Sequence, residues 1–238
     1  MKVLSIGNSF SQDAQRYLHE VAKSDGYDLQ TVNLFIGGCP LKSHHAYMLN
    51  GEPAYAYERN GQSTGEMISI PSALALEDWD YITVQQVSSS SAHYYSYFPY
   101  ITELVEYIRK CCPRAKVMVH ETWPYENGSE LLANQGFATS AEMFKAVKDC
   151  YARASKEVNA DGIIPSGTAM NEGINRGVKM HRDTFHAGYA IGRYLLALVW
   201  YKKLTGRSIA QNSFRDFDEP ADESQVKTII EIADEVVG

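Results

Sequence analysis

The amino-acid sequence predicts an α/β fold in which helices cover both faces of a doubly wound parallel β-sheet, giving three layers. Short runs of β-branched and aliphatic residues alternate with helical patterns along the chain, as in successive right-handed βαβ units. These runs are almost continuously apolar, which is typical of strands buried on both faces. No internal repeat or linker divides the sequence, so we expect residues 1–238 to form one domain.

Five strands are expected, at residues 3–6, 29–35, 81–86, 116–120 and 162–164. Helical patterns fill the connections, and they cover residues 11–23, 98–108, 144–158, 187–204 and 224–237. Pro113 ends the second of these helices, and Gly206 suits the C-terminal cap of the fourth. The turn-rich stretch 50–65 is interpreted as an excursion over the active edge of the sheet.

Composition excludes several classes of protein. The net charge is −7 and the basic residues are scattered, so nucleic acid is not expected as a partner. No apolar run approaches the roughly 20 residues that span a bilayer, so no membrane partner is expected. No secretory leader pattern opens the sequence. We expect a cytoplasmic protein, or a periplasmic or secreted one if a leader has been removed, with its four cysteines reduced.

The tripeptide Gly7-Asn8-Ser9 directly follows the first predicted strand. A serine at the turn from a strand into a helix projects its hydroxyl beyond the sheet, beside free N–H groups at the helix start. That placement suits a nucleophile and also stabilises a developing oxyanion. The alternative is that Ser9 only caps the helix.

Two further turns carry possible oxyanion donors. Gly37-Gly38-Cys39-Pro40 follows the second strand, and the backbone N–H of Gly38 could point at an anionic oxygen, although a simple tight turn is an alternative. Gln85 and Gln86 end the third strand, and an amide there can donate without adding charge. We favour Gln86; the alternative is an amide that ties loops together.

Asp183 and His186 are three residues apart, just before the predicted helix 187–204. At this spacing the carboxylate can accept a hydrogen bond from one ring nitrogen of the histidine, and the other nitrogen can face a nucleophile. In the alternative, Asp183 caps the helix and His186 is a partly exposed residue of its first turn. Because ligands bind beyond the carboxyl ends of parallel strands, we expect Ser9, Gly38 and Gln86 to meet this pair at one sheet edge.

These blocks resemble those of the SGNH (GDSL-like) hydrolase superfamily, whose flavodoxin-like fold and order of motifs match nearly the whole chain. The resemblance implies that Ser9 is the nucleophile, that Asp183 and His186 are the acid and base, and that Ser9 and Gly38 form part of the oxyanion hole. Asn8 replaces the usual aspartate, and Gln85-Gln86-Val87-Ser88 stands in place of the family's Gly-x-Asn-Asp block. Gly-Asn-Ser-Phe with Gln-Gln resembles a bacterial branch formerly of unknown function. The third oxyanion donor stays open between Gln86, Gln85 and Ser89.

The resulting hypothesis is a serine esterase that removes a short acyl group, acetyl above all, from a carbohydrate through an acyl-serine. Gln85, Trp123 and Tyr94 are candidate substrate-binding residues, the two aromatic rings as a sugar-stacking wall. The alternative is that the aromatic residues belong to the core. The alternatives are a carbohydrate-binding module on a decayed esterase scaffold, and a thioesterase or lysophospholipase-type lipid esterase. A nucleotide-binding protein is disfavoured because no phosphate loop is present.

Neither a cofactor nor a metal is expected for this chemistry. Several histidines lie near acidic residues and are possible metal ligands, namely His44, His45, His120 with Glu121, and His181 with Asp183. None of them has a recognised metal-binding spacing. The acyl length, the alcohol and the oligomeric state are left open by the sequence.

Overall fold

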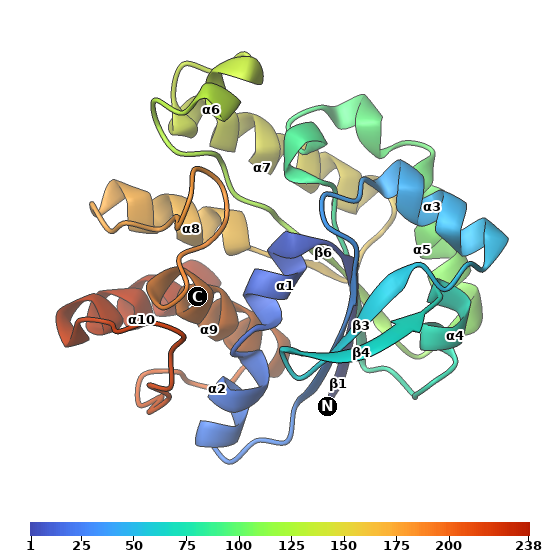
Figure 1. The fold of residues 1–238 in the computed structure, drawn as a ribbon, viewed down its shortest axis with the longest axis horizontal. Helices are drawn as coiled ribbons and strands as arrows, with labels where there is room; N and C mark the ends of the chain where they lie inside the picture. Colours follow the sequence, from blue (N-terminus) through green and yellow to red (C-terminus); the bar gives the residue numbers. More distant parts are fainter.

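A seven-stranded sheet lies between two layers of helices in the computed structural model, which describes residues 1–238 (Figure 1). The strand order is β4-β3-β2-β1-β5-β6-β7. Five strands are parallel and confirm the predicted ones: β1 (Lys2–Gly7), β2 (Gln30–Phe35), β5 (Tyr81–Val84), β6 (Lys116–His120) and β7 (Gly162–Ile164). The three-layer α/β prediction is therefore correct.

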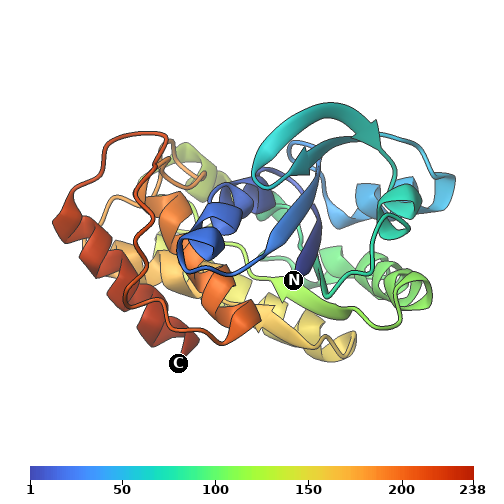
Figure 2. The same cartoon turned by 90° about the horizontal axis from the view of Figure 1, so that it is seen from below.

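The stretch 50–65 is not an excursion over the active edge. It contributes to an antiparallel hairpin, β3 (Tyr55–Arg59) and β4 (Gln62–Ile68), that extends the sheet beyond β2 (Figure 2). The turn between the two strands is Asn60-Gly61, and both residues have positive φ, 51° and 74°. Asn-Gly is a strong signal for a two-residue hairpin turn, so this pair could have predicted the hairpin.

Two predicted helices have different limits in the structure. The helix expected at 11–23 is divided into α1 (Ser9–Gln15) and α2 (Leu18–Ser24). The break lies beside Tyr17, whose hydroxyl donates to Tyr189 O and accepts from the N–H of Asp218. The helix expected from residue 187 begins later, as α9 (Ile191–Thr205), because residues before it make tertiary hydrogen bonds instead of helical ones.

The helices cover the two faces of the sheet unequally (Figure 1). One face packs against α1, α2, α8 (Ser166–Asn175) and α9, and α10 (Glu223–Val237) packs on the outside of α8 and α9. The other packs against α3 (Leu41–Asn50), α4 (Ile70–Leu74), α5 (Tyr100–Cys111) and α7 (Ser140–Glu157). Between β5 and α5 lie two 3₁₀ turns, η1 (Ser88–Ser90) and η2 (Tyr94–Tyr97), and α6 (Glu130–Asn134) follows β6.

The two faces have separate apolar cores because strand residues alternate in direction. On β1, Val3 belongs to the core under α9, whereas Leu4 and Ile6 belong to the core under α5. Helix α9 is apolar nearly all round, and Trp200 in it is fully buried. None of the helices combines the length and the apolar character that a bilayer-crossing helix needs.

The junction between β6 and α8 is tightly packed beside the carboxyl edge of the sheet. Glu121, directly after β6, is 3% exposed, and its Oε1 accepts from the N–H and the hydroxyl of Thr168, at 2.6 and 2.9 Å. The N–H of Gly167 donates to Glu121 O. Burial raises the pKa of Glu121, and the two hydrogen bonds from Thr168 oppose that shift without cancelling it.

Replacing Gly167 by alanine should destabilise the protein by about 1–3 kcal/mol, although alanine normally favours a helix by up to about 1 kcal/mol. The added Cβ would lie 2.1 Å from the backbone oxygen of Thr122, which cannot rotate away. Gly173→Ala, in the same helix, is the control, because its Cβ would meet only the flexible Met180 side chain. Urea unfolding of both variants tests this; equal stability of Gly167→Ala and wild type would contradict it.

Glu121→Gln should gain stability relative to wild type as the pH rises. A carboxyl group with a raised folded-state pKa binds its proton more tightly when folded, so its contribution is present at low pH and is lost as pH rises through the folded-state pKa. The glutamine has no such loss. Unfolding free energies measured between about pH 4 and about pH 8, with exposed Glu231→Gln as control, should show a widening difference; a constant difference would count against this account.

Candidate active site

Ser9 is the first residue of α1 and does not cap it. The cap is Asn8, whose Oδ1 accepts the N–H of Phe10 at 3.1 Å. The alternative in which Ser9 serves only as a cap is therefore wrong. No acceptor in the loops, turns and caps takes the backbone N–H of Ser9, and its side chain is half-buried beside the sheet edge.

Asn8 also connects the nucleophile turn to two other parts of the edge. Its Nδ2 donates to Cys39 O at 3.2 Å, and its Oδ1 accepts from Gln85 Nε2 at 2.8 Å. A carboxylate has no hydrogen to donate to Cys39 O. The amide at this position is therefore the side chain that draws the turn containing Gly38 against the start of α1.

Ser9, His186 and Asp183 form a continuous hydrogen-bonded triad. His186 Nε2 lies 2.9 Å from Ser9 Oγ, and His186 Nδ1 lies 2.8 Å from Asp183 Oδ2. The other carboxylate oxygen accepts the N–H groups of Phe185 and His186, at 2.9 and 2.7 Å. These are the contacts that orient a histidine as a general base for a serine hydroxyl.

The Asp183 carboxylate is biased towards its charged form. Burial raises its pKa, but the backbone N–H groups of His186 and Phe185 and the His186 ring oppose this, and the pKa lies below its usual value. The side chain is 44% exposed. Asp183 closes a local turn and does not cap a helix, since α9 begins only at Ile191.

Gly38 supplies a second unpaired backbone donor at this edge. Its φ is +63°, in the left-handed region that favours glycine, and a Cβ there would meet no atom within 4 Å. Glycine is therefore favoured at this position because of the positive φ, and not because a neighbouring atom lies too close for a side chain. Like Ser9, Gly38 has an N–H that no loop, turn or cap acceptor takes.

Gln86 is placed as a structural amide, which corrects its expected role as an oxyanion donor. Its Nε2 donates to the carbonyl and the hydroxyl of Ser96, at 2.9 and 3.1 Å. Its Oε1 accepts the N–H groups of Leu41 and Val87, at 3.0 and 2.8 Å. Both amide hydrogens are therefore used within the protein, and the side chain ties three loops together. Ser89, the other alternative, is exposed on η1.

Gln85 is likewise structural and not a substrate contact. It is 1% exposed, and its Oε1 lies 2.7 Å from His120 Nδ1. Because an amide oxygen only accepts, the His120 Nδ1 must carry the hydrogen. Burial lowers the pKa of His120 to about 3, so this ring is neutral. Gln85 and His120 thus form an uncharged support behind Asn8.

Of the two aromatic residues expected to bind substrate, Trp123 is placed against that expectation, and Tyr94 stays a prediction. Trp123 is fully buried, with its ring stacked at 4.0 Å on Phe10 and its Nε1 donating to Phe185 O. It has no surface to offer a sugar. Tyr94 is half-buried, and the guanidinium of Arg153 lies 3.7 Å from its ring centroid. The contacts of both rings are with residues distant in sequence, so a cluster of aromatic residues in the sequence does not predict them.

The histidines considered as metal ligands have separate partners. His44 Nδ1 lies 2.8 Å from the Tyr55 hydroxyl, His45 pairs with Glu103, and His181 contacts Pro124 O. No three His, Cys, Asp or Glu side chains come together in a way that could hold a metal ion. All four cysteine thiols are free.

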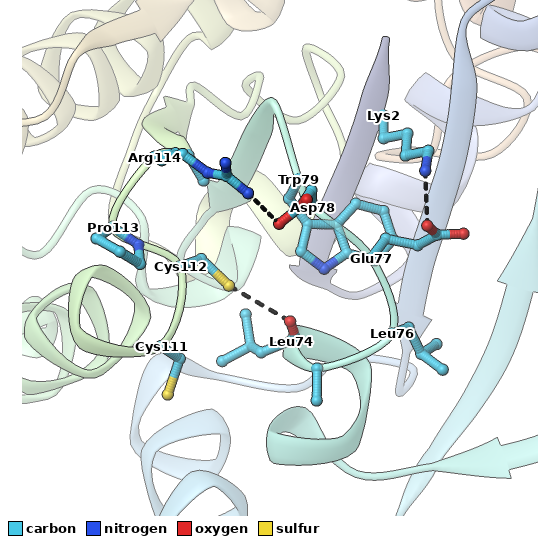
Figure 3. Close-up of a pocket in the computed structure, with 12 residues that line it drawn as sticks. Lys2, Leu74, Leu76, Glu77, Asp78, Trp79, Cys111, Cys112, Pro113 and Arg114 are labelled. Carbon is cyan, nitrogen blue, oxygen red and sulfur yellow. Dashed lines mark hydrogen bonds and ion pairs between the residues drawn. The ribbon is translucent and has the colours of Figure 1, made fainter.

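Figure 3 shows the residues that line a cavity of about 690 Å³. The cavity lies at the amino-terminal edge of the parallel strands, opposite the edge that carries the triad. Lys2 at the start of β1 lines it, together with residues 74–79, which precede β5, and 111–115, which precede β6. Its charged side chains are paired with one another, Lys2 with Glu77 and Arg114 with Asp78. Ligands of parallel sheets bind at the carboxyl ends, so the triad and not this cavity is the candidate active site.

The fold is shared with solved structures of low sequence identity. A protein from Slackia heliotrinireducens, described as a candidate SGNH hydrolase, is 23% identical with a TM-score of 0.59, over 85% of this chain and 97% of its own. A protein from Parabacteroides merdae, described as a candidate GDSL-like lipase, is 13% identical with a TM-score of 0.58, over 86% and 95%. The likeness to these two shows the fold alone. No curated protein sequence matches the chain.

A much nearer relative is the crystal structure of a DUF4886 family protein from Bacteroides uniformis. It is 37% identical, has a TM-score of 0.92, and the match covers 100% of this chain and 94% of that one. The family model for DUF4886 matches residues 2–231. The chain therefore belongs to the DUF4886 family, which is described as a domain of unknown function.

Proposed function

We propose that this protein is a serine ester hydrolase of the SGNH type. The observation that carries the proposal is the unbroken contact from Asp183 through His186 to Ser9, with separations of 2.8 and 2.9 Å. The fold shared with proteins described as SGNH hydrolases and GDSL-like lipases agrees with it. A structural role alone does not require an exposed carboxylate, an imidazole and a helix-terminal hydroxyl in this order.

In the proposed reaction, His186 Nε2 takes the proton of Ser9 as Oγ attacks the carbonyl carbon of the ester. The resulting oxyanion accepts hydrogen bonds from the N–H groups of Ser9 and Gly38. Asp183 keeps the imidazole in the tautomer with its hydrogen on Nδ1 and stabilises the imidazolium. His186 then gives the proton to the departing alcohol, and water, deprotonated by the same nitrogen, hydrolyses the acyl-serine.

The oxyanion hole of this proposal has two backbone donors and no side-chain donor. Gln86 is engaged with Ser96, and Gln85 with Asn8. One oxyanion donor is worth about 3 kcal/mol of barrier in related chemistry. Of the three side chains considered as a third donor, Ser89 is the one whose hydroxyl has no partner within the protein.

For the substrate, we propose a short acyl group, acetyl above all, on a carbohydrate. Support comes from the openness of the edge, where Gly38 is exposed and the Asp183 side chain is 44% exposed. An exposed site can accept an ester on a large alcohol. Tyr189, three residues after His186, is 42% exposed, and the guanidinium groups of Arg182 and Arg193 each lie 4.7 Å from its ring centroid.

Ser9→Ala and His186→Ala should each lower the hydrolysis of an acetyl ester by about 10³-fold or more, because each removes one member of the proton relay. Wild type should react covalently at Ser9 with an organophosphonate probe, and Ser9→Ala should not. Ser63→Ala, an exposed serine on β4, is the matched control and should behave as wild type. Glycan binding without labelling of wild type would instead favour a binding module on an inactive scaffold.

Rates on p-nitrophenyl esters should fall as the acyl chain lengthens from acetyl, and acetylated xylo- or manno-oligosaccharides should release acetate. The reason is the proposed acetyl substrate, whose acyl group is the shortest of the series. The measurement is kcat/KM across the chain-length series. A rise in kcat/KM towards long acyl chains would replace the carbohydrate proposal by a lipid esterase.

A further inference from the structure

Asp13 lies one helical turn beyond Ser9 on α1, so the two side chains share a face of that helix. Its carboxylate is completely buried. A buried carboxylate is stable only when charged or polar donors surround it. Two of the three donors that surround Asp13 come from residues that flank Asp183–His186, the segment that carries the other two members of the triad, and the third comes from α9.

Three donors converge on the Asp13 carboxylate. Arg182 Nη1 lies 2.9 and 2.8 Å from its two oxygens, and the backbone N–H of Ala187 donates to Oδ2 at 3.2 Å. Arg193 Nε, from α9, donates to Oδ1 at 2.8 Å. Arg182 and Ala187 are the residues immediately before Asp183 and immediately after His186. One carboxylate thus contacts both ends of the segment Asp183–His186.

The segment between these ends is itself closed. The N–H of Arg182 donates to His186 O at 3.1 Å, and the Arg182 side chain also donates to Ala187 O. His181 and Ala187 form an isolated antiparallel bridge. The middle of the segment is held on its other side, where the N–H of Glu126 donates to Thr184 O at 2.8 Å and Trp123 Nε1 donates to Phe185 O at 2.7 Å. The contacts of Asp13 at the two ends are the ones that attach this short, closed segment to the helix of Ser9.

A displacement of this segment from α1 would separate Asp13 from Arg182 and Ala187. That would leave a buried carboxylate with Arg193 as its remaining partner, which is unfavourable. The separation of Ser9 and His186 is therefore coupled to the pairing of Asp13. The outer carboxylate of the same network, Asp218, pairs with Arg193 and Arg16 and contacts no residue of the segment.

We propose that Asp13 is a positioning residue that keeps His186 Nε2 within hydrogen-bonding distance of Ser9 Oγ. It does so through Arg182 and Ala187 and without touching the substrate. The inference rests on the proposed esterase function for its kinetic consequence. Its structural consequence, a less firmly held segment when Asp13 loses its charge, does not depend on that function.

The test compares Asp13→Asn with Asp218→Asn in the full chain. Asp13→Asn should lower kcat for an acetyl ester by about 10–100-fold with KM little changed, since misplacement of about 1 Å costs on the order of 10²-fold. The rate of organophosphonate labelling should fall in parallel, while the final extent stays at one label per chain and so reports a folded site. Asp218→Asn should remain within about twofold of wild type, because it removes ion pairs outside the segment.

If Asp13→Asn does not fold, Arg182→Gln tests the positioning role instead. The Arg182 side chain is 17% exposed, so this substitution removes the contact with Asp13 from the partner nearer the surface. It should reduce kcat in the same direction. Hydrogen exchange of residues 182–190 should be faster in the Asp13 or Arg182 variant than in Asp218→Asn. Normal kcat with unchanged exchange in a folded variant would overturn the inference. Absence of wild-type labelling would overturn the proposed function, and exchange would still decide the positioning role.

Discussion

The candidate site depends on the burial of one negative charge, that of Asp13, between α1 and the segment that precedes α9. Ser9 and His186 are 177 residues apart in sequence, and their contact needs two elements to be held in register. A buried carboxylate with directional donors resists a relative movement of the two elements, because each donor that is lost leaves buried charge unpaired. The ion pairs of Asp13 with Arg182 and Arg193 supply that constraint between the two elements.

A second constraint attaches the nucleophile helix to the sheet through hydrogen bonds. Gln15 donates to Ser5 on β1 at 2.6 Å, and Ser11 Oγ lies 2.7 Å from Asn33 on β2. Asn33 in turn donates to Glu58 of the added hairpin at 2.7 Å. The face of the sheet under α1 is thus partly polar, unlike the face under α5. These directional contacts set the orientation of the helix whose first residue is the candidate nucleophile.

Much of the site was predictable because its parts follow general rules of local structure. Ser9 and Gly38 follow parallel strands, whose carboxyl ends meet at one edge whatever the rest of the chain does. Asp183 and His186 are close in sequence, so their pairing needs only a local turn. Gln86 and Trp123 were misjudged because their roles depend on Ser96 and on Phe10, partners that only the folded chain brings to them.

The sequence by itself determined the alternation of strands and helices, the five parallel strands and the identity of the groups that meet in the candidate site. Hydrophobic periodicity and turn residues determine local structure over a few positions of the chain. The Asn60-Gly61 turn is such a local signal, and it indicates the hairpin that was not among the expected strands. Only the tertiary structure decided which amides are consumed internally, where the helix before Tyr17 breaks, and how Asp13 reaches Arg182. Those outcomes depend on burial and on partners distant in sequence, since a buried polar group takes whichever donor or acceptor the fold places beside it.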